Sequence, residues 1–92
     1  MSIVVRFTPA GLTAEQYGEA VRKLEDQGAF PPEGLDYHVC FGPDGDLRVS
    51  EIWDSPEQFQ AFGERLLPIL AAAGIEFSAP PEISEVHRVM KR

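Results

Sequence analysis

A hairpin signal near the middle of the chain constrains the fold more than any other feature. Two runs of alternating apolar and polar residues, Leu35 to Gly42 and Leu47 to Trp53, flank the turn segment Pro43-Asp44-Gly45. Such alternation is typical of half-buried strands, and a cluster of Pro, Asp and Gly between them marks a turn. The segment therefore predicts two antiparallel neighbouring strands.

The turn chemistry leaves two registers open. A Pro at the second and a Gly at the fourth position favour a type I turn followed by a left-handed Gly bulge, which would pair Tyr37 with Glu51. A two-residue Asp-Gly turn would instead put His38 opposite Glu51. One residue of slip turns every side chain to the other face of the sheet. The first register is preferred because it separates polar from apolar residues.

The remaining segments are read from their start and stop signals. A β-branched run predicts a first strand, and Thr13 opens a capping box that predicts a helix ending near Gly28. Ser55-Pro56 predicts a second helix start, and Pro68 should bend or shorten that helix. The expected elements are strands at 2–8, 35–42, 47–53 and 83–90 and helices at 13–28 and 55–74.

This order predicts one α+β domain over residues 1–92. A β-α-β-β-α-β order is the ferredoxin-like arrangement, in which a four-stranded antiparallel sheet carries two helices on one face and the second and fourth strands lie outermost. The opposite face of the sheet would carry Val4 and Ile52 beside polar residues. We expect a second copy of the chain to cover that face, which predicts a homodimer.

Charge and cysteine content exclude several partners. The net charge of −7 argues against nucleic acid and anionic membranes as partners. The N-terminal apolar run stops at Arg6, which indicates no signal peptide, and the single cysteine, Cys40, cannot form an internal disulfide. These features predict a cytoplasmic protein in which Cys40 is a small buried side chain.

The segment SEIWDSPEQFQAF (50–62), together with the element order, resembles the dimeric α+β barrel superfamily and, within it, the antibiotic biosynthesis monooxygenase-like domains. The resemblance implies a homodimer whose sheets pack into a barrel, a pocket between each sheet and its helices, and oxidation without metal or flavin. Haem-degrading relatives carry a Trp at the position of Trp53, but also a helix His and a first-strand Asn that this chain lacks. No cofactor is therefore expected.

The candidate catalytic residues are Glu51, Tyr37 and His38. A carboxylate on an apolar face is costly unless it is hydrogen-bonded, and it could serve as a general base or acid. Tyr37 would donate a hydrogen bond to it, and His38 would enter the pocket in the alternative register. Otherwise His38 and His87 would lie on the outer strands where two chains meet. The competing reading of Glu51 is a structural ion pair, and the two His and one Cys lack the spacing of a metal site.

The candidate substrate-binding residues are Trp53 as an aromatic wall, Tyr17 as an orienting hydroxyl and Phe62; each could also be ordinary core. The loops at 29–34 and 74–82 are expected to shape the pocket. The predicted function is the binding of a small apolar or aromatic molecule between sheet and helices, with cofactor-free, monooxygenase-like oxidation. The alternatives are a non-catalytic ligand-binding or protein-interaction module, and a lyase or isomerase using Glu51.

Overall fold

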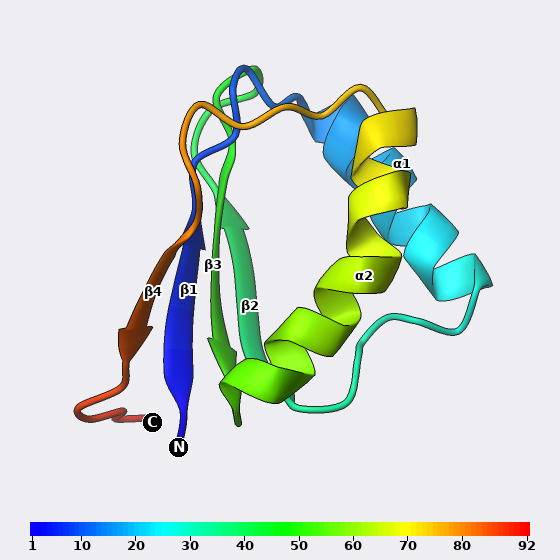
Figure 1. The fold of residues 1–92 in the computed structure, drawn as a ribbon. Coiled ribbons are helices and arrows are strands. Elements are labelled where there is room, and N and C mark those ends of the chain that lie inside the picture. The colour runs from blue at the N-terminus through cyan, green and yellow to red at the C-terminus, as the bar shows by residue number, and fades with distance from the viewer.

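The computed structural model describes residues 1–92 and has the predicted element order (Figure 1). Its elements are β1 (Ile3–Phe7), α1 (Ala14–Asp26), β2 (Leu35–Phe41), β3 (Arg48–Trp53), α2 (Pro56–Ala72) and β4 (Glu82–Glu85). The strands form one antiparallel sheet in the order β2-β3-β1-β4, and both helices lie on the same face of it. The ferredoxin-like α+β fold, with β2 and β4 outermost, is confirmed.

Both helices begin at the predicted caps. The Thr13 side chain accepts a hydrogen bond from the Gln16 backbone N–H (3.1 Å), and the Gln16 side chain accepts one from the Thr13 backbone N–H (3.1 Å). This reciprocal capping box satisfies two amides that the first turn leaves free. The Ser55 side chain caps α2, with Pro56 at the first helical position. Neither helix combines the length and the apolar composition that crossing a bilayer requires.

The predicted length of the last strand is wrong, whereas α2 bends as one of the two effects expected of Pro68. α2 continues to Ala72, with a change of direction along its length (Figure 1). Pro68 and Glu64, whose carbonyl loses its usual helical partner, are both exposed, so water can satisfy that carbonyl. β4 ends at Glu85 rather than Met90, because its partner β1 begins at Ile3 and offers few residues beyond it.

The preferred hairpin register is also wrong, and the alternative is correct. The Asp46 N–H donates to the Pro43 carbonyl (2.9 Å), which closes a two-residue turn, and Gly45 adopts the positive φ of 89° that this turn needs. His38 consequently pairs with Glu51, and Tyr37 pairs with Ile52. A bulge between Leu35 and Tyr37 changes the register at the start of β2. His38 therefore faces the helices and Tyr37 faces away.

The core lies between the sheet and the two helices. Trp53 and Val5 are completely buried (0% exposed), and Glu51 is the one charged residue in the buried set (4% exposed). The buried cluster contains Ile3, Val5, Leu12, Ala20, Leu24, Ala29, Leu47, Trp53, Phe62, Ile69 and Ile75. No buried side-chain nitrogen or oxygen lacks a hydrogen-bond partner. The buried Glu51 carboxylate is therefore hydrogen-bonded to neighbouring side chains.

The turn geometry can be tested at Gly42. Its φ is 104°, and an added Cβ would lie 3.0 Å from the Asp46 carbonyl oxygen. Gly42→Ala should lower the free energy of unfolding by about 1–3 kcal/mol, because an L residue is strained there. Gly18→Ala, in α1 with open space around it, should raise stability by roughly 0.5–1 kcal/mol. Urea unfolding measures both variants, and a Gly42→Ala protein as stable as the wild type would contradict this register.

Candidate functional site

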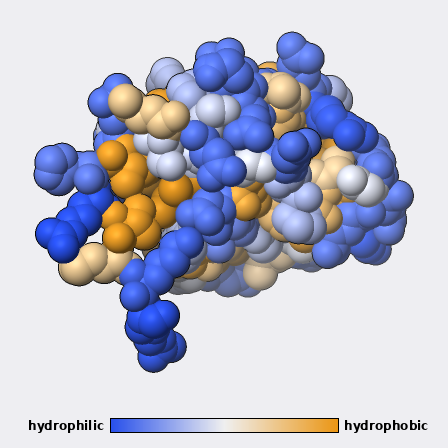
Figure 2. All heavy atoms as spheres, turned by 90° about the horizontal axis from the view of Figure 1, so that it is seen from below, coloured by the Kyte–Doolittle hydropathy of each residue, from blue (hydrophilic) through white to orange (hydrophobic).

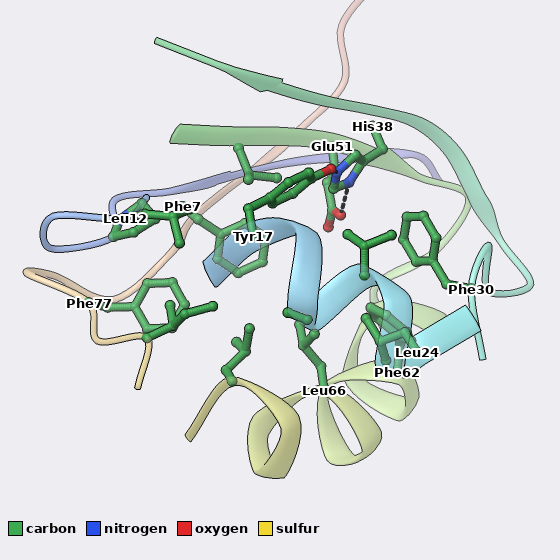
Figure 3. Close-up of a pocket in the computed structure, with 16 residues that line it drawn as sticks. Phe7, Leu12, Tyr17, Leu24, Phe30, His38, Glu51, Phe62, Leu66 and Phe77 are labelled. Atoms are coloured by element: carbon green, nitrogen blue, oxygen red, sulfur yellow. Dashed lines mark hydrogen bonds and ion pairs between the residues drawn. The ribbon is translucent and has the colours of Figure 1, made fainter. Parts of the chain in front are cut away.

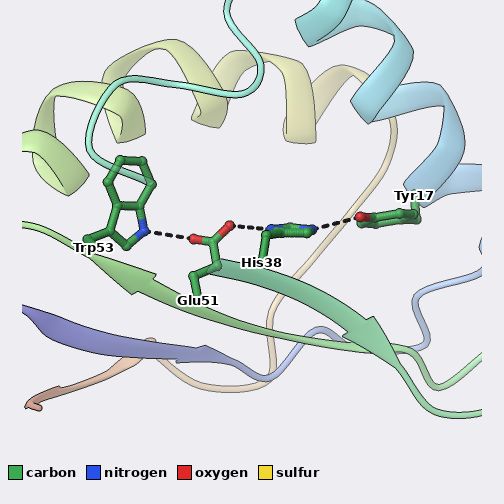
Figure 4. A network of polar contacts seen from close by, with 4 residues as sticks. All are labelled: Tyr17, His38, Glu51 and Trp53. Carbon is green, nitrogen blue, oxygen red and sulfur yellow. Dashed lines mark hydrogen bonds and ion pairs between the residues drawn. The ribbon is translucent and has the colours of Figure 1, made fainter. Parts of the chain in front are cut away.

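Four side chains form a continuous hydrogen-bonded row under the helices (Figure 4). The Trp53 indole N–H donates to Glu51 Oε1 (3.0 Å), Glu51 Oε2 lies 2.6 Å from His38 Nδ1, and His38 Nε2 lies 2.7 Å from the Tyr17 hydroxyl. Trp53 and Glu51 come from β3, His38 from β2 and Tyr17 from α1. The row therefore joins the first helix to both strands of the hairpin.

The local sequence places each member of the row. Glu51 and Trp53 are two residues apart on one strand, so their side chains point to the same face. The hairpin register sets His38 directly across from Glu51. The Tyr17 ring lies end to end with the imidazole and nearly in its plane, with ring centres 6.0 Å apart and planes 19° apart (Figure 4). From the other side, the Phe30 ring meets His38 edge-on at 5.4 Å. The imidazole is thus held between two aromatic rings.

The hydrogen-bond partners determine where the protons lie. An ionised carboxylate can only accept, so with Glu51 charged both its oxygens receive donors, from Trp53 and from His38 Nδ1–H. In the neutral imidazole Nε2 is then the acceptor, and the Tyr17 hydroxyl donates to it. Both nitrogens of His38 are engaged, and the nitrogen that can accept a proton is the one beside Tyr17.

An apolar cavity opens beside this row (Figure 3). About 70 Å³ of it is open to the centre of a water molecule, roughly five times the ~10–15 Å³ that one ordered water needs. Phe30 and Phe77 lie at opposite ends of it. Its 16 lining residues, 13 of them hydrophobic, are Phe7, Pro9, Leu12, Tyr17, Ala20, Val21, Leu24, Phe30, His38, Val49, Glu51, Phe62, Leu66, Leu70, Ile75 and Phe77. We call this space the inner cavity.

Burial shifts two ionisable groups near the row. The pKa of Tyr17 is raised above its ordinary value of 10.0, mainly by desolvation and further by the negative charges that Cys40 and Glu51 can carry. Desolvation also raises the pKa of Cys40. Both groups therefore stay protonated at neutral pH: Tyr17 remains a hydrogen-bond donor and Cys40 remains a thiol.

The structure brings most of the predicted site residues together. Glu51, His38, Tyr17 and Phe62 all line the inner cavity. Trp53 does not line it, but lies wholly in the core and holds Glu51 through its indole N–H. The partner of Glu51 is His38, and not the Lys or Arg of the ion pair that was the alternative interpretation of this residue.

The placement of Tyr37 and the histidines needs correction. Tyr37 is 49% exposed on the opposite face of the sheet and cannot donate to Glu51. The expectation that His38 lies at an edge between two chains is wrong, because its side chain points into the inner cavity. His87 lies beyond the end of β4 and is exposed. All three corrections follow from the one-residue change of register and the shorter last strand.

Sequence reasoning missed several wall residues. Phe30 and Phe77 belong to the two loops expected to shape the pocket, but loops have no periodicity that would single out one side chain. Leu66 and Leu70 share the apolar stripe of α2 with true core residues, and the spacing does not distinguish wall from core. No group of three or more His, Cys, Asp or Glu side chains lies close enough to hold a metal ion.

The raised pKa of Tyr17 predicts a stability change at high pH. The folded state holds the Tyr17 proton more tightly than the unfolded state, so its contribution is complete below about pH 10 and is lost as pH rises through the folded pKa. Between pH 8 and pH 11, wild type should lose more unfolding free energy than Tyr17→Phe, measured by urea denaturation. Tyr37→Phe is the control and should retain the wild-type slope, because Tyr17 remains. Equal slopes for wild type and Tyr17→Phe would contradict the prediction.

No protein-family model matches the sequence, and no curated protein matches it. Solved structures do match it. Protein YJCS has a TM-score of 0.67 at 13% identity, over 95% of this chain and 100% of that chain. SnoaB, a cofactor-independent oxygenase from Streptomyces nogalater, has a TM-score of 0.62 at 18% identity, over 99% of this chain and 96% of its own.

A protein from Chloroflexus aurantiacus J-10-fl, assigned as an antibiotic biosynthesis monooxygenase, has a TM-score of 0.59 at 18% identity, over 98% of this chain and 95% of its own. Identities this low establish the fold and leave the chemistry to the site. The predicted resemblance is thus confirmed for the fold: the chain has the fold of the antibiotic biosynthesis monooxygenase-like proteins.

Proposed function

We propose that this protein binds a small apolar or aromatic molecule in the inner cavity and removes a proton from it with His38. The observation that carries the proposal is a hydrogen-bonded Tyr17–His38–Glu51 row that opens into an otherwise apolar space. Pockets with an apolar lining and a few convergent polar groups are the usual setting of ligand sites. For His38 to act as the base, the acidic group of the ligand takes the place of the Tyr17 hydroxyl at Nε2, and the displaced hydroxyl orients the ligand.

The row has the features that proton abstraction needs. When His38 takes a proton it becomes a cation, and the Glu51 carboxylate 2.6 Å away stabilises that cation where both side chains are largely buried. The Trp53 indole N–H holds the other carboxylate oxygen, so the carboxylate is already in position. Tyr17 also lines the inner cavity, so its hydroxyl stays within reach of a ligand bound beside His38.

The fold resemblance supports an oxidative outcome. A carbanion formed at a CH₂ group of an activated phenol or ketone can bond to O₂ at that carbon, and with the returned proton it becomes a hydroperoxide. Loss of water then leaves a carbonyl, so that CH₂ and O₂ give C=O and H₂O. The carbon loses four electrons and O₂ gains them, and no further reductant is needed. SnoaB, of similar fold, is a cofactor-independent oxygenase.

Proton abstraction can be tested without knowing the natural substrate. The probe 1,2-benzisoxazole opens when a base removes its ring C–H proton: the N–O bond breaks and 2-cyanophenolate, which absorbs in the ultraviolet, is released. Glu51→Gln should lower the protein-catalysed rate by about 10²-fold or more. The Gln amide would donate to His38 Nδ1, which forces the other tautomer and leaves Nε2 protonated.

The control is Asp36→Asn, which neutralises an exposed carboxylate that pairs with Lys91 away from the cavity; its rate should equal wild type. The probe's affinity for Glu51→Gln should stay within a few fold of wild type. If Glu51→Gln converts the probe as fast as wild type does, Glu51 has no catalytic role. If wild type binds the probe without accelerating its conversion, the protein is a non-catalytic ligand-binding module. Oxygen uptake with anthrone, whose CH₂ becomes a carbonyl, then tests the oxidative step.

The helix-free face of the sheet supports the expected homodimer. Tyr37 and Phe41 are 49% and 41% exposed there, and Val4, Val39 and Ile52 are half-buried beside them. In Figure 2, seen from the end where both termini lie, apolar side chains interrupt the hydrophilic surface on the side occupied by the sheet. Exposed apolar patches on a small domain mark interaction sites. If two copies of the chain pack against each other through this face, the apolar patch of each copy is buried.

A charge placed on this face should therefore dissociate the dimer. Val39→Asp is expected to weaken self-association at least tenfold, because a carboxylate would have to be buried without a partner. Sedimentation velocity measures the association, and far-UV circular dichroism checks that the variant is folded. Gln60→Glu, on α2 at the other side of the molecule, adds the same charge and should leave the dimer intact. A monomeric wild type at high concentration would refute the dimer.

A further inference from the structure

A second, larger cavity shares a wall with the inner one. It measures about 600 Å³ and lies between α2 and the segment that leads to β4. Its lining residues are Phe7, Phe59, Gln60, Gly63, Leu66, Leu67, Leu70, Phe77, Ser78, Ala79, Pro80 and Pro81. Phe7, Leu66, Leu70 and Phe77 line both spaces. We call this space the outer cavity, and these four side chains are the partition between the two.

The lining of the outer cavity favours an uncharged apolar occupant. None of its 12 residues is charged, although 25% of the chain is. Leu67, on this wall, is 63% exposed. An open surface without charge on an otherwise charged protein leaves apolar atoms in water unless something covers them. The outer cavity thus offers apolar contact and no ion pair.

Gly63 is the position in α2 at which an added side chain would enter this space. It lies inside α2, where Gly is less favourable than Ala because the chain loses more freedom. A Cβ built on Gly63 would meet no atom within 4 Å, so no packing within the chain requires a glycine there. Gly63 lines the outer cavity, and a side chain at this position would occupy part of it.

Phe77 is the one exposed member of the partition. It lies at one end of the inner cavity (Figure 3) and is 37% exposed. Its backbone is tied to the segment after β1: the Ala10 N–H donates to the Glu76 carbonyl (2.8 Å), and the Ser78 N–H to the Thr8 carbonyl (3.0 Å). Rotation of the ring, rather than movement of the loop, would therefore join the two cavities.

We infer that the outer cavity is a subsite for an uncharged apolar extension of the molecule whose acidic group meets His38. The inference rests on the proposed function. The inner cavity alone, at about 70 Å³, has roughly half of the ~150 Å³ in which an apolar cavity holds benzene, so even a ring-sized head must extend to the partition. A fused ring system or an alkyl chain would pass Phe77 into the outer cavity. The substrate class is thus an elongated molecule with an acidic, ring-sized head and an apolar tail.

A series of 4-alkylphenols tests this arrangement, from phenol through propyl and pentyl to octyl. The readout is the NMR resonance of the indole N–H of Trp53, the one Trp in the chain. This N–H is hydrogen-bonded to Glu51, so its chemical shift reports on the row. Phenol should move the resonance weakly. Affinity should then rise about two- to fourfold for each methylene that enters the outer cavity, since burial of a methylene is favourable.

Gly63 variants locate the tail. With Gly63→Leu, the affinity for alkylphenols should no longer rise with the length of the alkyl group. The affinity for phenol should stay within about twofold of wild type. Gly63→Ala should raise Tm by about 2–8 °C yet weaken octylphenol binding. The matched control is Gly18→Ala, another helix-interior glycine with open space around it, on α1 and away from both cavities. It should raise Tm similarly and bind the whole series as wild type does.

The outcomes separate the two proposals. If phenol moves the Trp53 resonance but longer chains bind no better, or Gly63→Leu keeps the gain with length, the outer subsite is refuted and the inner site stands. If no member of the series moves the resonance, the inner binding site is refuted and the subsite with it. A gain with length that Gly63→Leu abolishes and Gly18→Ala preserves establishes the subsite.

Discussion

The rest of the structure depends on the pairing of one buried carboxylate. Removing a charged group from water costs several kcal/mol unless partners replace the lost hydration. Glu51 receives the Trp53 indole N–H on one oxygen and His38 Nδ1 on the other, and Tyr17 completes the row. The row therefore helps to set the distance between α1 and the sheet, because a shift of either would leave a buried polar atom without its partner.

A polar row of this kind is a poor way to gain stability. Apolar side chains of similar volume usually serve a core as well or better, because they pay no desolvation. Here the row lies against a lining that is otherwise almost entirely apolar, so such residues would fit the surroundings. What the polar row adds is an imidazole with an accepting nitrogen in a space that shields it from water. That is a chemical capacity, and it explains the presence of His38 and Glu51 better than packing does.

The sequence predicted the elements and their order because those signals are local. The Thr13 capping box, the Ser55-Pro56 start and the alternating strands each involve a few neighbouring residues. The register was not predictable in this way, since the Gly42 to Gly45 segment suits two turn types. The observed register comes with contacts outside the hairpin: the Leu47 N–H donates to the Leu12 carbonyl, and His38 is hydrogen-bonded to Tyr17. The wrong register separates polar from apolar side chains better only if His38 is counted as a polar residue that faces solvent.

The cavity walls escaped prediction for a related reason. Phe77 is placed by backbone bonds to residues nearly seventy positions earlier in the chain, and no local pattern encodes them. Gly63 also escaped prediction, because a glycine inside a helix does not by itself mark a site: Gly18 in α1 has open space around it too and lines neither cavity. The structure supplies the missing half of the argument: no atom of the chain needs the space beside Gly63, so that space is available to a ligand.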